Sequence, residues 1–265
     1  MQQASDFREE SLTLKSLIAD LDDLAFEQTT QFKSWTINDV FRHLHFWNKA
    51  VMVATEGDEA FAAFFEGVGA HMLKGGSLPE YEKAYLDGLS GGALREAWAS
   101  LVDETADAYA ALDPSSRVPW AGPSMSARSA ISARQMETWA HGQEVFDVLG
   151  TDREEHDRIR NIVVLGINTF GWTFKVRGET PPDPVPFVSL VSPSGEVWTY
   201  GESQQSNFIQ GDAVEFAQVV TQTRNIGDTS LTVVGDPASD WMSKAQCFAG
   251  GANPPPAKGS RFKAG

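Results

Sequence analysis

One stretch of the sequence, RQMETWAHGQEVFDVLG at residues 134–150, places a carboxylate and an imidazole one helical turn apart. On a helix of about 100° per residue, Glu137 and His141 share an arc with several alanines, which allow a second helix to approach closely. This arc is therefore the predicted buried face. An ionised glutamate buried without a partner is strongly disfavoured, so Glu137 needs a cation, a proton or an arginine.

A second helix, predicted over residues 34–54, offers another inward imidazole. His43 falls within the apolar stripe of this helix, whereas His45 lies near the edge of the stripe. A metal ion would satisfy His43, Glu137 and His141 together, because one helix face supplies two ligands and the other helix supplies the third. The structural alternative is that Glu137 and His141 hydrogen-bond each other and that His43 is a core histidine. Spacing alone leaves both interpretations open.

The elements that must position these residues divide the chain into two parts. Up to about residue 178 the apolar residues recur at helical spacing, which predicts four or more amphipathic helices, as in a bundle. The segment KGGSLPEY, residues 74–81, predicts a break between helices. Beyond residue 186, short β-branched and aromatic runs alternate with helical ones. We therefore expect an α+β protein.

The predicted boundary falls near Gly150. We expect a four-helix bundle over residues 1–150, followed by a small C-terminal α/β domain over residues 151–265. The second domain is predicted to begin with a long helix over residues 153–176, where apolar residues again follow a helical rhythm.

The composition excludes several classes of partner. The chain has 265 residues and a formal net charge of −15, and no segment forms a strong basic patch. Binding to nucleic acid or to an anionic membrane surface is therefore disfavoured. A small anionic substrate remains compatible, because one buried arginine can set the local potential. No apolar run reaches the roughly 20 residues of a membrane span, and the single cysteine, Cys247, suits a reducing compartment. We expect a cytoplasmic protein, and the sequence does not indicate its oligomeric state.

Three segments resemble a known family. SWTINDVFRHLHFWN and METWAHGQEVFDVLG are similar to the metal-binding segments of the mycothiol-dependent maleylpyruvate isomerase family, which shares its metal-binding bundle with the DinB-like proteins. NFIQGDAVEFAQVVTQTRNIGDTSLTVVGD is similar to the carboxyl-terminal domain of that family. The three segments occur in the same order as in the family and are spread over residues 34–236, so the resemblance covers most of the chain.

The resemblance implies a site. It identifies the first domain as a DinB-like metal-binding bundle with His43, Glu137 and His141 as ligands, and it assigns the catalytic arginine to Arg224. Where the family commonly has aspartate three residues after the second histidine, this chain has Glu144. Glu144 could be a hydrogen-bond partner of His141, a substitute ligand or a general base.

The implied chemistry needs a divalent metal and a thiol. Three protein ligands leave a fourth position open, as in catalytic zinc sites. Zn²⁺ is the first candidate, although two histidines and a glutamate also accept nickel, iron or manganese. The cosubstrate implied is mycothiol or an analogous low-molecular-weight thiol. The reaction implied is addition of the thiol to a cis-unsaturated keto acid, rotation about the new single bond, and elimination to the trans isomer.

The leading hypothesis is therefore a metal-dependent, thiol-using isomerase or transferase acting on a small anionic or unsaturated substrate. Two alternatives stay open. One is a metal-dependent hydrolase that uses metal-bound water. The other is a non-catalytic protein that binds a metal or a small ligand, since a fold does not fix its function.

Overall fold

The computed structural model describes residues 1–265, which divide into two compact units, Met1–Leu149 and Gly150–Gly265. The first unit is helical apart from one short hairpin. Its elements are α1 (Gln2–Leu17), η1 (Ala25–Glu27), α2 (Ile37–Ala54), α3 (Asp58–Leu73), α4 (Leu78–Tyr85), α5 (Gly91–Ala111), β1 (Arg117–Val118), β2 (Met125–Ser126) and α6 (Ala127–Val148).

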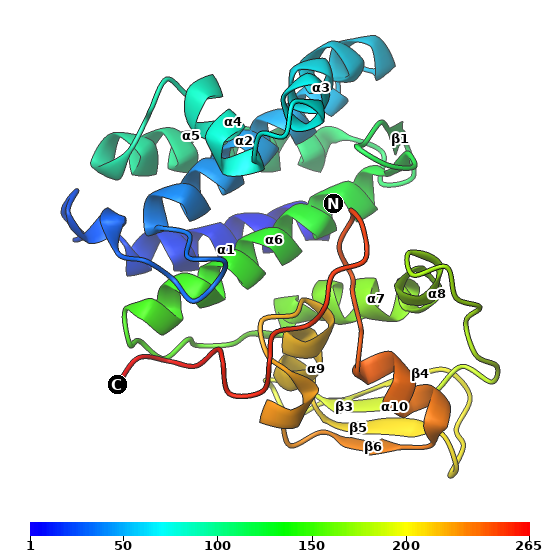
Figure 1. Ribbon diagram of the computed structural model, residues 1–265. Helices are drawn as coiled ribbons and strands as arrows, with labels where there is room; N and C mark the ends of the chain where they lie inside the picture. Colours follow the sequence, from blue (N-terminus) through cyan, green and yellow to red (C-terminus); the bar gives the residue numbers. More distant parts are fainter. The chain divides into compact units, whose positions relative to one another are not determined.

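Four long helices, α1, α2, α5 and α6, form a bundle in this unit (Figure 1). Helices α1 and α2 each pack against both α5 and α6, while α3 and α4 pack against α2. Aromatic side chains fill the centre, where the rings of Phe41 and Trp98 meet edge to face with centroids 5.0 Å apart and both residues are fully buried. Each such side chain contributes about 1.5–3 kcal/mol by leaving water, so the apolar stripes decide how the helices are oriented.

The elements of the second unit are η2 (Asp157–Ile159), α7 (Arg160–Asn168), α8 (Phe170–Lys175), β3 (Phe187–Val191), β4 (Val197–Tyr200), β5 (Phe208–Asp212), α9 (Ala213–Val220), η3 (Ile226–Asp228), β6 (Thr232–Val234) and α10 (Asp236–Met242). The strands form a four-stranded mixed sheet in the order β4-β3-β5-β6. Strands β3 and β4 form an antiparallel hairpin, β3 and β5 are parallel, and β5 and β6 are antiparallel. Helix α9 packs against β3 and β5, and α7 packs on α9 (Figure 1).

The predicted fold class is confirmed: the protein is α+β, with an N-terminal helical bundle and a small C-terminal α/β part. The prediction of one long helix over residues 153–176 is wrong. The structure has two short helices there, α7 and α8, which meet at Thr169. The hydroxyl of Thr169 donates to the carbonyls of Leu165 and Gly166, and such bonds slightly destabilise and often bend a helix.

The predicted break at residues 74–81 is also wrong in its second half, because α4 begins there. The Ser77 hydroxyl and the Glu80 carboxylate cap this helix reciprocally, and Pro79 lies in its first turn. A proline is tolerated at this position, since the first backbone amides of a helix have no partner within it.

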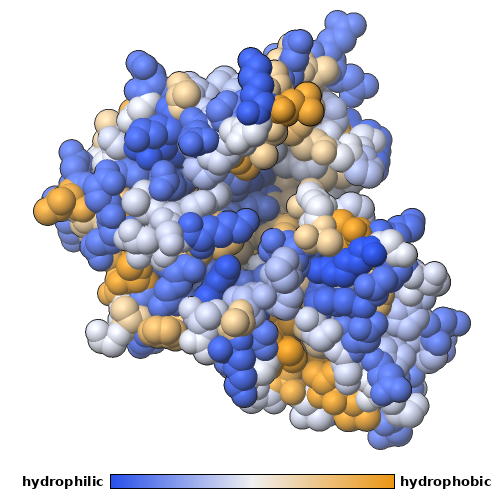
Figure 2. Space-filling view, viewed as in Figure 1, coloured by the Kyte–Doolittle hydropathy of each residue, from blue (hydrophilic) through white to orange (hydrophobic).

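Figure 2 shows a face on which hydrophilic residues predominate and hydrophobic ones are scattered, in keeping with a net charge of −15. None of the helices combines the length and the apolar character needed to cross a membrane.

Candidate metal centre

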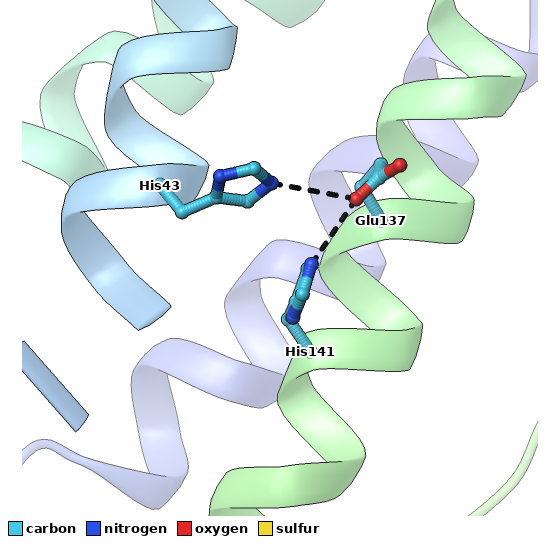
Figure 3. Close-up of side chains that lie close together, drawn as sticks. All are labelled: His43, Glu137 and His141. Carbon is cyan, nitrogen blue, oxygen red and sulfur yellow. Dashed lines mark ion pairs between the residues drawn. The ribbon is translucent and has the colours of Figure 1, made fainter. Parts of the chain in front are cut away.

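Three side chains from two helices converge inside the first unit (Figure 3). His43 comes from α2, and Glu137 and His141 come from α6. One donor atom from each lies within 4.8 Å of the other two. These are the three residues that the sequence pattern placed on inward helix faces.

Local sequence fixes the start of each helix and hence the direction of these side chains. Helix α2 begins at a reciprocal cap, in which the Thr36 hydroxyl accepts from the Asp39 amide and the Asp39 carboxylate accepts from the Thr36 amide. Helix α6 begins at Ser126, whose hydroxyl accepts from the Ser129 amide. His43 then lies about two turns into α2, at 3.6 residues per turn.

The donor separations suit one small cation. Oε2 of Glu137 lies 3.2 Å from Nε2 of His141 and 3.7 Å from Nε2 of His43. Two ligands that are each about 2.1 Å from a tetrahedral ion lie roughly 3.4 Å apart, so the spacing fits an ion held between them. The side chains of Glu137 and His141 are 25% and 12% exposed, so the cluster is not fully closed to solvent.

The cluster is strongly polarised. Burial by itself would lower the pKa of His43, but the charge of Glu82 and the interactions with Glu137 raise that pKa to about 9. Burial raises the pKa of Glu137, but hydrogen bonds from His141 and His43 hold it well below its usual range. Burial and the charge of His43 lower the pKa of His141. The arrangement therefore places a positive charge at His43, between the carboxylates of Glu82 and Glu137. A divalent cation bound beside these carboxylates would compensate their negative charge in the same way.

A fourth residue, Glu82 of α4, was missed by the sequence analysis. Its Oε1 lies 2.8 Å from Nδ1 of His43, and Trp47 Nε1 donates to the same oxygen at 3.1 Å. Glu82 is fully buried. The Ser-x-x-Glu pattern at Ser77 could have revealed α4 and hence an inward glutamate, but the neighbouring glycines and Pro79 indicated a break.

Arg134 is a second residue that the sequence analysis passed over. It precedes Glu137 by three residues and His141 by seven, so the three share one face of α6. Its Nε donates to Asn48 Oδ1 at 3.1 Å, and its Nη2 donates to the Leu44 carbonyl at 3.3 Å. Burial lowers the pKa of Arg134 to about 10, although Glu137 and Glu82 oppose this, so the guanidinium is charged at neutral pH.

Aromatic rings wall one side of the cluster. The Trp35 ring stacks on the His141 ring at an interplanar angle of 10°, with centroids 5.7 Å apart. It also contacts the His43 ring at 5.2 Å, and the edge of Phe32 meets His141 at 5.1 Å. These contacts restrict rotation of both imidazoles and exclude water from that side.

The two predicted catalytic residues lie outside this donor set. Glu144 lies on α6 beyond His141 and is 1% exposed. Arg224 belongs to the second unit, where it follows α9 and donates from Nη1 to the Thr223 carbonyl at 2.9 Å.

The sequence matches one family model and two known proteins. Residues 7–146 match the model of the mycothiol maleylpyruvate isomerase N-terminal domain. Uncharacterized proteins from two strains of Mycobacterium tuberculosis are each 32% identical to the chain over 255 residues, which is 96% of this chain and 96% of theirs.

Two solved structures share the architecture. The crystal structure of the mycothiol-dependent maleylpyruvate isomerase superimposes with a TM-score of 0.54 at 16% identity, covering 82% of this chain and 87% of that chain. A histidine-to-alanine mutant of the isomerase gives a TM-score of 0.53 over the same coverage. At this identity the likeness establishes the fold.

Proposed function

The chain belongs to the mycothiol maleylpyruvate isomerase family, and on this premise we propose that it is a metal-dependent enzyme. It would use a low-molecular-weight thiol, mycothiol or an analogue, in an isomerase or transferase reaction on a small unsaturated anion. The observation that carries the proposal is the convergence of donor atoms from His43, Glu137 and His141 within 4.8 Å.

The donor set suits a divalent ion of the zinc type. Two imidazoles and one carboxylate would hold it, and Zn²⁺ is the first candidate, with nickel, iron and manganese as alternatives. When bound, such an ion supplies Lewis acidity that favours the ionised form of a thiol at neutral pH.

The protein's own charges favour an anionic substrate. The Arg134 guanidinium is held by Asn48 and by the Leu44 carbonyl, and it shares the helix face of Glu137. Together with a divalent ion, Arg134 would outweigh the charges of Glu82 and Glu137, which leaves the site locally positive within an acidic protein.

The proposed isomerisation conserves every atom. The thiolate adds to the carbon–carbon double bond of a cis-unsaturated keto acid, and the former double bond becomes a single bond. Rotation followed by elimination of the same thiolate gives the trans isomer, so the thiol is recovered. Arg224 would bind a substrate carboxylate through charge-assisted hydrogen bonds or stabilise the developing enolate.

Elemental analysis of protein purified without added metal tests the metal centre. We expect about one ion per chain in the wild type and none in His43→Ala or Glu137→Ala. His156→Ala is the matched control, because it removes an imidazole that is 44% exposed in the second unit. A wild type without stoichiometric ion would overturn the proposal.

The thiol requirement needs a separate assay. The metal-loaded protein is mixed with a cis-unsaturated keto acid in the presence and absence of mycothiol, and the trans product is quantified. We expect conversion only with thiol, and equal conversion without it would overturn this part of the proposal. Arg224→Lys should lower kcat/KM by about tenfold or more, because a charge-assisted hydrogen bond contributes roughly 1.5–3 kcal/mol.

One second candidate is a metal-dependent hydrolase with Glu144 as general base, since Glu144 is a buried carboxylate three residues beyond His141 on α6. Reactions run in ¹⁸O-labelled water distinguish the two functions. A hydrolase incorporates ¹⁸O at the bond that it cleaves, and Glu144→Gln should abolish this incorporation. Thiol addition and elimination cleave no bond with water, so they incorporate no ¹⁸O in this way.

A further inference from the structure

A buried carboxylate lies behind one histidine of the candidate metal centre. Glu82 Oε1 is 2.8 Å from His43 Nδ1, the nitrogen that faces away from Glu137 and His141. The Glu82 side chain is fully buried and that of His43 is 10% exposed, so this contact is shielded from water.

The carboxylate is held in one position by a second donor. Trp47, one turn beyond His43 on α2, donates from Nε1 to the same Oε1 at 3.1 Å. Glu82 itself comes from α4, whereas His43 and Trp47 belong to α2. The cap formed by Ser77 and Glu80 fixes where α4 begins. Two donors on one oxygen therefore determine the orientation of Glu82.

Burial removes water from the Glu82 carboxylate, and this loss must be compensated. A buried carboxylate is costly unless a cation or strong donors compensate for the lost water. The Oε2 atom of Glu82 has no hydrogen-bond partner, so His43 and Trp47 provide the hydrogen bonds that hold this side chain. A carboxylate that accepts from Nδ1 also selects the imidazole form with its proton on Nδ1.

We propose that Glu82 is a positioning residue for the metal: it holds His43 with Nδ1 protonated and with the lone pair of Nε2 directed at the ion. This inference rests on the metal centre proposed above and extends it to a residue of a third helix. Carboxylates that accept from the distal nitrogen of a histidine ligand fix the orientation of its ring and increase its basicity, and their loss commonly weakens metal binding by about 10- to 100-fold.

The two histidines are positioned by different means. His141 stacks against Trp35, whereas His43 is held by a carboxylate. Stacking restrains a ring without choosing which nitrogen carries the proton. Removal of Glu82 should therefore affect His43 selectively.

The test compares Glu82→Gln with Glu80→Gln. Glutamine keeps the size of the side chain but removes the charge, and its amide can donate to Nδ1 and so favour the wrong form of the ring. Glu80 lies on the same helix, and its side chain is 70% exposed. Glutamine keeps the oxygen that accepts from the Ser77 amide and so preserves the cap, which makes Glu80→Gln the matched control. Affinity for Zn²⁺ alone is measured by competition with a chromophoric chelator.

We expect Glu82→Gln to bind Zn²⁺ about 10- to 100-fold more weakly than the wild type, while Glu80→Gln binds as the wild type does. Glu82→Asp, which keeps the charge on a shorter side chain, should recover part of the affinity. If Glu82→Gln binds Zn²⁺ as tightly as the wild type, the positioning role is wrong and the metal centre stands. A wild type that binds no Zn²⁺ overturns both proposals.

A measurement on the unmodified protein does not depend on the folding of any variant. In ¹⁵N-labelled protein loaded with Zn²⁺, NMR should show His43 with a proton on Nδ1, at a downfield position, and with Nε2 bound to the metal. A His43 ring bound to the metal through Nδ1, or without a proton there, would overturn the proposal.

Discussion

The two units of the molecule bury polar groups of different kinds. In the bundle, charged side chains such as Glu82 and Arg134 lie in the interior near the imidazoles of His43 and His141. In the second unit one charged side chain, that of Arg153, is 4% exposed and pairs with Glu155. The other buried polar residues there carry hydroxyls and amides: Thr173, Ser192, Asn207, Thr221, Gln222, Thr223 and Gln246.

The neutral groups have a structural task. Asn207 donates to the Pro184 carbonyl at 2.9 Å and accepts from the Ala238 amide at 3.1 Å, and Gln222 donates to the Ala245 carbonyl at 2.9 Å. They satisfy the backbone of irregular segments, which must be paired when buried. Burial of charge is costlier, and strongly shifted pKa values cluster at functional sites. The contrast supports the proposal of a metal centre in the bundle.

Removal of the metal ion should produce the largest difference between the two units. An ion at about 1,000 times its dissociation constant stabilises the state that binds it by roughly 4 kcal/mol. Addition of a chelator should therefore increase amide hydrogen exchange in peptides from α2 and α6, with less change in α9 and β5, as measured by mass spectrometry. Equal loss of protection in both units would show that metal binding is not confined to the bundle.

Arg134→Met should give the next largest effect. The substitution leaves Asn48 Oδ1 and the Leu44 carbonyl without their donor and removes a cation near Glu137, which should lower the free energy of unfolding by about 3 kcal/mol. Urea denaturation measures the change. The exposed Arg128, also on α6, provides the control, and Arg128→Met should stay within about 0.5 kcal/mol of the wild type. Similar losses in both variants would show that the burial of Arg134 is unimportant.

The sequence predicted one part of the site and missed another for physical reasons. His43, Glu137 and His141 could be placed on inward faces because helical periodicity relates residues of one helix, and their donor atoms converge in the structure. Glu82 could not be placed in this way. It comes from a separate eight-residue helix, and its partner, His43, lies 39 positions away. Such a contact depends on how helices pack, and periodicity does not contain that information.

The same limit explains the outcome for the fold. Long stripes predicted the bundle and the change to strands beyond residue 186, because each is a repeated local signal. The break between α7 and α8 falls at Thr169, whose hydroxyl bonds to the preceding turn. Gly166 adds a tertiary constraint, since a Cβ there would lie 2.9 Å from Val220 of α9. A helical rhythm alone contains neither piece of information.

Gly235→Ala tests the second unit by itself. Gly235 has a φ of +93°, and a Cβ there would lie 2.3 Å from the Ser206 carbonyl oxygen. Strain of this type costs about 1–3 kcal/mol, so we expect faster hydrogen exchange in β6 and α10 with unchanged metal content. Gly195→Ala is the control, because its φ is +90° but no atom lies within 4 Å of the added Cβ. A loss of metal in Gly235→Ala would break the separation between the two units.

The smallest expected effect concerns a surface carboxylate of the second unit. Asp157 accepts hydrogen bonds from the hydroxyl of Ser194 at 2.6 Å and from its amide at 2.9 Å, and the hydroxyl bond is the main reason that the pKa of Asp157 lies below its usual value. A lowered folded-state pKa means that the carboxylate stabilises the fold above its unfolded pKa of about 4 and loses this contribution as the pH falls through the folded value.

The stability difference between the wild type and Asp157→Asn should therefore be greatest near neutral pH and should shrink in acid. Urea denaturation monitored by hydrogen exchange in β3 and β4, from about pH 7 to about pH 3, measures it. A difference that stayed constant over this range would show that the charge of Asp157 contributes nothing. The second unit would then depend on neutral hydrogen bonds at its surface as well as in its core, and its contrast with the charged interior of the bundle would be sharper still.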